Sequence, residues 1–162
     1  MLEVVRKAKA QNYPENKAES WNEHNFDAEK GFRYMANVTT IIRMYKPLPD
    51  ALTSAEIGMM LHCAQFIEME TGMLYYRSDR TSKPMSAAEL AKRLGRSISQ
   101  VYKFIGRMRN LRVMAKEDRR LYVNPCYFFR GRYLSYHLYQ LFKPDLQTLL
   151  PAWVLNKYEG NA

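Results

Sequence analysis

The chain has 162 residues, of which 47% are hydrophobic and 25% are charged, and its formal net charge is +9 at pH 7. This length suits one domain, or a small domain with helical arms, and the apolar fraction can fill a core, which argues against a disordered chain. No stretch reaches the roughly 18 to 20 apolar residues that a membrane helix needs. Residues 1–25 lack the apolar centre of a signal peptide. We therefore expect a cytoplasmic protein with no membrane partner.

The positive charge is unevenly distributed along the chain. Between Arg77 and Arg132 the sequence holds 15 Lys and Arg against 4 Asp and Glu, whereas the remainder holds 10 basic and 12 acidic residues. All of the excess therefore lies in one segment. Such a concentration is typical of a surface that meets nucleic acid or another acidic partner.

The N-terminal third gives the weakest structural signals. Residues 1–30 are polar with few apolar anchors, which predicts an arm or a loosely packed helix. The stretch from Phe32 to Tyr45 is rich in β-branched and aromatic residues, which favours a strand without excluding a helix. We divide the chain into an N-terminal arm at 1–30, a core domain at 31–132 and a C-terminal helical extension at 133–162.

Three helices are predicted to begin with the same device, a capping box in which Ser or Thr precedes Glu or Gln by three residues. The first helix is expected to run to Thr71-Gly72, and the second to end at Gly95 in a left-handed conformation. The three boxes are Thr53 with Glu56, Ser86 with Glu89, and Ser97 with Gln100. The apolar stripe of the first helix is Ile57, Met60, Leu61, Ala64 and Ile67, and that of the third is Ile98, Val101, Phe104, Ile105, Met108 and Leu111.

Short strands are predicted between and after these helices. MLYYR forms a strand before the second helix, and SDRTSKP forms a polar loop. VMAK and RLYVN form a hairpin that turns at Glu117-Asp118 and is closed by Asn124-Pro125. An aromatic strand or loop then leads into a helix, and a terminal helical segment surrounds Pro151.

This order of helix, strand, helix, tight turn, helix and two-stranded hairpin is that of a winged helix-turn-helix. We therefore expect a mainly α fold with a small β hairpin (α+β), carrying N- and C-terminal extensions. In such a module the third helix enters the major groove of DNA, and the hairpin contacts the flanking backbone.

The third helix has a polar and basic face once its apolar stripe is removed. Gln pairs with adenine and Lys with guanine, so Gln100 and Lys103 are expected at base edges. Serine hydroxyls at a helix N-terminus suit phosphate, and arginine suits phosphate or bases. The full set on the helix is Arg96, Ser97, Ser99, Gln100, Lys103 and Arg107, and the set on the hairpin is Lys116, Arg119 and Arg120, which is expected to contact phosphates.

Other interpretations of these residues stay open. A basic helix face is often only solvated surface, and a helix-turn-helix also occurs in modules that bind proteins. The dense aromatic residues suit a core or a dimer interface better than base stacking. Cys63 and Cys126 have no partner at metal-ligand spacing, so we expect buried thiols. No catalytic motif, metal site or cofactor site is apparent, and we predict no enzyme, no cofactor and no bound metal.

The segment MSAAELAKRLGRSISQVYKFIGRMRNLRVMAKE, followed by LYVNPCYFFRG, resembles the winged helices of MarR-like regulators and, more closely, RepL-type replication proteins of plasmids and phages. Asp118 and Arg120 also resemble the D-x-R of MarR-like wings. The resemblance covers about half of the chain. It implies sequence-specific binding of double-stranded DNA at a promoter or an origin, and dimerisation through terminal helices. Folding of these helices back onto their own domain is an equal alternative.

The sequence thus predicts a non-catalytic, sequence-specific DNA-binding protein, a transcriptional regulator of a phage or plasmid that acts by occupying its operator as a homodimer. Two alternatives remain: a replication initiator that binds an origin, and a winged-helix protein that binds and modulates a host replication or transcription protein. An acidic groove on such a partner would attract the same cations.

Overall fold

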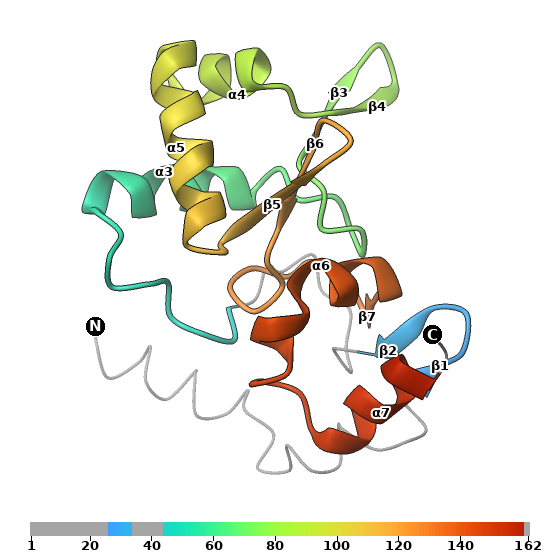
Figure 1. Ribbon diagram of the computed structural model, residues 1–162. Coiled ribbons are helices and arrows are strands. Elements are labelled where there is room, and N and C mark those ends of the chain that lie inside the picture. The colour runs from blue at the N-terminus through green and yellow to red at the C-terminus, as the bar shows by residue number, and fades with distance from the viewer. Residues whose placement is uncertain (1–25, 34–43, 161–162) are drawn as a thin grey trace, which may run out of the picture.

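The computed structural model describes residues 26–33 and 44–160, and it is a mixed α+β fold with two small antiparallel hairpins (Figure 1). The predicted N-terminal arm therefore lies largely outside the described residues, as does most of the stretch between Phe32 and Tyr45. The helices are α3 (Ser54–Ala64), α4 (Ala87–Leu94), α5 (Ile98–Asn110), α6 (Tyr136–Leu146) and α7 (Ala152–Gly160). The strands are β1 (Phe26–Asp27), β2 (Gly31–Arg33), β3 (Tyr75–Ser78), β4 (Thr81–Pro84), β5 (Met114–Glu117), β6 (Arg120–Val123) and β7 (Tyr133–Leu134).

Helix α3 begins as predicted but ends earlier. Thr53 is its N-cap, and both hydrogen bonds of the capping box with Glu56 are present. The expected extension to Thr71-Gly72 is wrong, because the helix ends at Ala64 and Ile67 forms a β-bridge with Leu74 instead. The predicted stripe is wrong at Leu61 as well, whose side chain is 49% exposed. Ile67 fits the apolar spacing of α3 because it is buried as well, but it lies beyond the helix in a segment that forms a β-bridge.

Hairpin β3–β4 replaces the polar loop that the sequence predicted at residues 78–84. The strand over MLYYR is confirmed, but the chain reverses at Asp79-Arg80 and pairs with β3 as a second strand. All four residues of β4 are exposed, so this strand has no apolar alternation to reveal it. Cross-strand hydrogen bonds, which composition does not report, hold it in place.

Helices α4 and α5 follow the predicted pattern closely. Gly95 ends α4 in the left-handed conformation, with a φ of 62°. The Ser97 box with Gln100 is complete, whereas Ser86 caps α4 without a return bond from Glu89, whose carboxylate pairs with Arg93 at 2.9 Å. The buried stripe of α5 consists of Val101, Phe104, Ile105 and Met108, while Ile98 is 49% exposed at the first turn.

Hairpin β5–β6 forms where the sequence predicted it, but its turn is shifted by one residue. Glu117 pairs with Arg120, so the two turn residues are Asp118 and Arg119, both with positive φ. Beyond β6, the side-chain amide of Asn124 is fully buried. It donates to the carbonyl of Arg112 at 2.7 Å and accepts from the Cys126 N–H at 3.0 Å, which satisfies its polar atoms and closes the hairpin.

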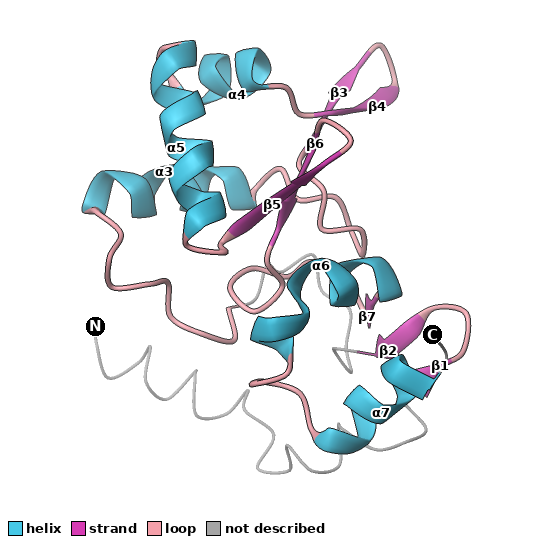
Figure 2. Ribbon diagram, viewed as in Figure 1, coloured by secondary structure: helices cyan, strands magenta, loops and turns pink. Residues whose placement is uncertain are grey.

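Two hydrophobic clusters share the β5–β6 hairpin, and Figure 2 shows α5 on one side of this hairpin and α6 on the other. The first is built by α3, α4 and α5 with Met114, Leu121 and Val123. The second is built by α6 and α7 with Tyr122 and Cys126. Because side chains alternate between the two faces of a strand, one short hairpin can serve both clusters.

The C-terminal helices fold back onto the preceding chain. Tyr158 of α7 stacks on Tyr139 of α6 with ring centroids 4.2 Å apart, and its hydroxyl donates to the carbonyl of Leu134 in β7. Strand β7 pairs with β2, which pairs with β1, so the N-terminal strands join the same end of the molecule. The apolar faces of α6 and α7 thus pack within their own chain.

Candidate nucleic-acid interface

Helix α5 presents a polar outer face opposite its buried stripe. At 3.6 residues per turn, the positions furthest from the buried side are Ser99, Lys103, Gly106 and Asn110. Ser99, Lys103 and Asn110 are exposed, and Gly106 is half-buried. Tyr102 borders this face with 60% of its surface exposed. The face is therefore hydrophilic at its centre and carries one large aromatic side chain at its edge.

The sequence-predicted cations of this region lie around one hollow between α5 and the beginning of α3. The hollow has a volume of about 330 Å³, and Arg96, Gln100, Lys103 and Arg107 all line it. Arg96 and Lys103 form no ion pair with any residue in the described part of the chain. Both side chains are therefore available to an outside ligand.

Arg107 differs from the other predicted cations because it is already engaged. Its Nε lies 2.6 Å from Oε1 of Glu56, and its Nη2 donates to the carbonyl of Ala51. The N–H of Thr53, together with the Arg107 guanidinium, lowers the pKa of the Glu56 carboxyl. Arg107 thus connects α5 to the start of α3, and a ligand would have to compete for it.

Ser97 and Gln100 are also partly engaged, in the cap of α5. The Ser97 hydroxyl accepts from the Gln100 N–H at 3.2 Å, and Oε1 of Gln100 accepts from the Ser97 N–H at 3.1 Å. A bidentate contact of Gln100 with adenine uses both its amide oxygen and its amide nitrogen. Such a contact would break the cap, whereas a contact through the amide nitrogen alone would preserve it.

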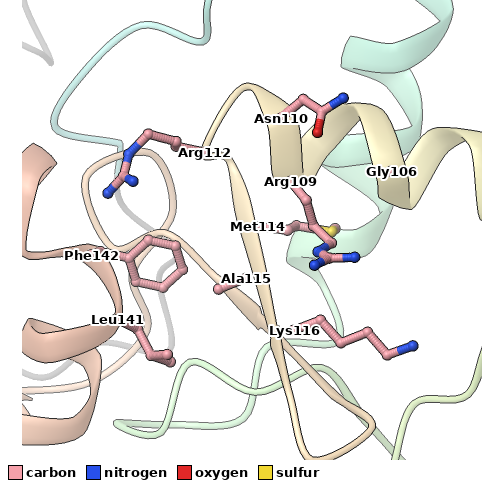
Figure 3. Close-up of a pocket in the computed structure, with 9 residues that line it drawn as sticks. All are labelled: Gly106, Arg109, Asn110, Arg112, Met114, Ala115, Lys116, Leu141 and Phe142. Atoms are coloured by element: carbon pink, nitrogen blue, oxygen red, sulfur yellow. The ribbon is translucent and has the colours of Figure 1, made fainter.

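A second hollow of about 390 Å³ lies between α5, β5 and α6 (Figure 3). Arg109 from α5 and Lys116 from β5 point to the same side of it, and neither has an ion-pair partner among the described residues. Arg112 lies on the other side and is held by Asp145, with its Nη2 2.8 Å from Oδ2. The hollow therefore combines two free cations with one neutralised cation.

The β5–β6 hairpin carries its cations free and its glutamate paired. Lys116, Arg119 and Arg120 are all exposed, without an ion pair to any described residue. Glu117 instead lies 2.5 Å from Nε2 of His137 on α6. The ring of His137 also packs edge-on against Tyr122, with centroids 4.9 Å apart. Helix α6 thereby supports the hairpin on the side away from α5.

Sequence reasoning did not select Arg109 and Asn110 on α5, nor Arg80 at the tip of β3–β4. Arg109 and Asn110 follow Tyr102 and Lys103 by seven residues, so helical spacing was a sufficient signal for both. Helical spacing could not select Arg80, whose place at a hairpin tip depends on the unpredicted strand β4.

The remaining candidate groups are inert or dispersed. Cys63 and Cys126 are free and buried, as predicted, and burial raises the pKa of each thiol to about 12. Over residues 26–33 and 44–160 no cluster of His, Cys, Asp and Glu suits a metal ion. Within the same ranges no helix has the length and hydropathy needed to cross a bilayer. Comparisons of the chain with protein-family models, curated proteins and solved structures found no match.

Proposed function

We propose that the protein binds double-stranded DNA in a sequence-specific, non-catalytic manner through a winged helix-turn-helix. In this proposal α4 and α5 are the helix-turn-helix, α5 is the recognition helix and the β5–β6 hairpin is the wing. The protein would regulate transcription of a phage or plasmid by occupying its operator as a homodimer. The apolar faces of α6 and α7 are used within the chain, so the dimer would need another surface.

The observation that carries the proposal is the group of exposed, unpaired cations on α5, its preceding turn and the wing. The cations Arg96, Lys103, Arg109, Lys116, Arg119 and Arg120 are exposed and have no ion-pair partner in the described chain, and they all lie on α5, its preceding turn or the wing. Glu89 is paired with Arg93, Glu117 lies against His137, and Asp118 at the wing turn has no ion pair with any described residue. The six cations outnumber these three acids, and a surface with such an excess of positive charge attracts the phosphate backbone.

The outer face of α5 suits a groove. An α-helix with its side chains is about 10–12 Å wide and B-DNA has a major groove about 12 Å wide, so one helix fills it. Lys103 lies at the centre of the outer face, where it would meet base edges. The wing cations would lie beside the groove, where phosphates are the available partners.

Fluorescence anisotropy tests the proposal with a duplex selected from a randomised pool, a random duplex and a random single strand. The selected duplex is expected to bind at least 1000-fold more tightly than the random one, on the order of the specificity of known DNA-binding proteins. Equal and weak binding to all three nucleic acids would contradict the proposal. The selected sequence also separates the two genetic roles, since direct repeats of an origin would favour a replication initiator over a regulator.

Two variants separate the roles of helix and wing. Lys103→Ala is expected to cost about 1–3 kcal/mol on the selected duplex and less on random DNA, because it removes a base contact. Arg119→Ala should weaken both duplexes about equally, because phosphates carry no sequence information. Lys157→Ala is the matched control, since it removes one exposed cation from α7, which lies at the other end of the molecule (Figure 1). Equal losses for Lys103→Ala on both duplexes would refute the base-reading role.

A further inference from the structure

The two hairpins of the protein carry the same four-residue pattern at their tips. Residues 77–80 read Arg-Ser-Asp-Arg and residues 116–119 read Lys-Glu-Asp-Arg, a cation, any residue, then Asp-Arg. In each hairpin Asp and Arg are the two turn residues, and both have positive φ. The φ values are 49° and 66° for Asp79 and Arg80, and 46° and 63° for Asp118 and Arg119.

Arg80 and Arg119 occupy the second turn position, at which a turn of this kind favours glycine. A two-residue hairpin turn with two positive φ values is of the type I′ pattern, which favours Asn-Gly or Asp-Gly. Asp suits the first position, but a long side chain at the second is rare and strained. A strained arginine in the same place of both hairpins indicates that its charge at the tip has a use.

Each hairpin also places cations on both of its faces. The register of β3–β4 pairs Arg77 with Ser82 and Tyr76 with Lys83, so Arg77 and Lys83 lie on opposite faces. In β5–β6, Lys116 and Arg120 lie on opposite faces by the same rule. Arg77, Arg80 and Lys83 are exposed and have no ion pair with any residue that the structure describes.

The hairpins leave a common base in the same direction. Met73 forms an antiparallel bridge with Tyr122, and the Leu74 N–H donates to the carbonyl of Leu121 at 2.8 Å. In an antiparallel bridge, the residues after Met73 lie beside the residues before Tyr122. Both tips therefore lie at one end of the molecule, away from α7 (Figure 1).

Hairpin β3–β4 is braced at its base rather than hanging free. The Arg93 guanidinium of α4 lies 5.6 Å from the ring centre of Tyr76 in β3 and 5.0 Å from that of Phe66. Glu89 holds the same guanidinium at 2.9 Å. Beyond Leu74 the strand continues for four residues, so its tip extends about 13 Å from the base at 3.3 Å per residue.

We propose that β3–β4 is a second phosphate-binding arm, which contacts the backbone of the same DNA duplex as the β5–β6 wing. This inference rests on the proposed function and extends it. The ligand is the phosphate backbone, because the arm offers cations on both faces and at the tip. Phosphates line both sides of a groove, so a two-stranded ribbon of this kind is matched on each side.

The decisive variant is Arg80→Gly, because it removes the tip cation while relieving the turn. Glycine has no side-chain penalty at positive φ, so the melting temperature should stay the same or rise. Arg119→Gly is the matched variant in the wing, and Lys157→Ala is the control for loss of one charge elsewhere. Affinity for random and selected duplexes is measured by anisotropy between 50 and 200 mM salt.

A plot of log affinity against log salt concentration has a negative slope, and loss of one phosphate contact reduces the magnitude of that slope by about 0.9. Between 50 and 200 mM salt, wild-type affinity should therefore fall about 3.5-fold more than that of Arg80→Gly. The same change is expected for Arg119→Gly, twice this slope change for the double variant, and none for Lys157→Ala. Equal reductions on random and selected duplexes would support a backbone contact.

Two outcomes would overturn the inference, and they differ. If Arg119→Gly lowers the salt slope while Arg80→Gly behaves like Lys157→Ala, β3–β4 is not an arm although the proposed function stands. If the wild-type protein has no salt-dependent affinity for duplex DNA, the proposed function fails and the second arm fails with it.

Discussion

Substitution of Gly106 by alanine should stabilise the protein and weaken its binding to DNA. Gly106 is the ninth of the 13 residues of α5, and a Cβ added there would meet nothing within 4 Å. Glycine inside a helix costs about 0.5–1 kcal/mol relative to alanine because its backbone loses more freedom on folding. With no clash to offset this gain, Gly106→Ala should raise the free energy of unfolding by about 0.5–1 kcal/mol.

Gly95→Ala is the matched control for this experiment. A Cβ at Gly95 also meets nothing within 4 Å, but this residue has a φ of 62°. An L-residue pays about 1–2 kcal/mol in the left-handed region, so the same substitution should lower stability here. The two variants differ in backbone conformation and not in crowding.

Urea unfolding followed by far-UV circular dichroism measures both variants. In thermal unfolding, a change of 1 kcal/mol in the free energy of unfolding of a protein of this size corresponds to roughly 2–4 °C in melting temperature. A loss of stability in Gly106→Ala would refute the assignment of that position to an open helix surface. A free energy of unfolding that stays the same in Gly95→Ala would refute the left-handed conformation at the end of α4. In the anisotropy assay, Gly106→Ala should weaken the selected duplex, since its methyl group lies on the outer face of α5.

Two further predictions concern titratable groups. Because burial raises the pKa of the Cys63 and Cys126 thiols to about 12, neither should react with a thiol reagent at pH 8 in the folded protein, and both should react in guanidinium. A fast-reacting thiol in the folded state would contradict their burial. The pKa of Glu56 lies below its ordinary value of 4.5, through the N–H of Thr53 and the charge of Arg107. Its stabilising effect is therefore full above pH 4.5 and declines as the pH falls below that value, so the melting temperature of Glu56→Gln should depend less on pH in this range than that of the wild type.

Local signals in the sequence were sufficient for the helix starts. Thr53, Ser86 and Ser97 each cap the helix that was predicted to begin after them, because an N-cap bond spans only three residues. The left-handed end of α4 at Gly95 and the β5–β6 hairpin were predicted for the same reason, since turns also depend on neighbouring residues. The position of the hairpin turn was wrong by one residue, because Glu117-Asp118 and Asp118-Arg119 have similar composition and only strand register separates them.

The sequence did not predict the features that depend on contacts between different segments of the chain. Strand β4 has no apolar residues in alternation, so its pairing with β3 decides its structure. Ile67 matched the spacing of a longer helix, yet its bridge to Leu74 ends that pattern. The packing of α6 and α7 against the β5–β6 hairpin also depends on contacts between distant segments. Aromatic composition alone could not show whether these residues form a core or a dimer interface.

Sequence alone therefore determined the kind of surface this protein has: a strongly basic segment, a capped helix with a polar face, and a hairpin with cations at its tip. Tertiary structure decided which of those charges are available. Arg107 and Arg112 are neutralised by Glu56 and Asp145, acids that lie 51 and 33 residues away in the chain. Ion pairing depends on distance in space, which sequence spacing does not report, and so the free charges of α5 and of the two hairpins emerge only when the chain is folded.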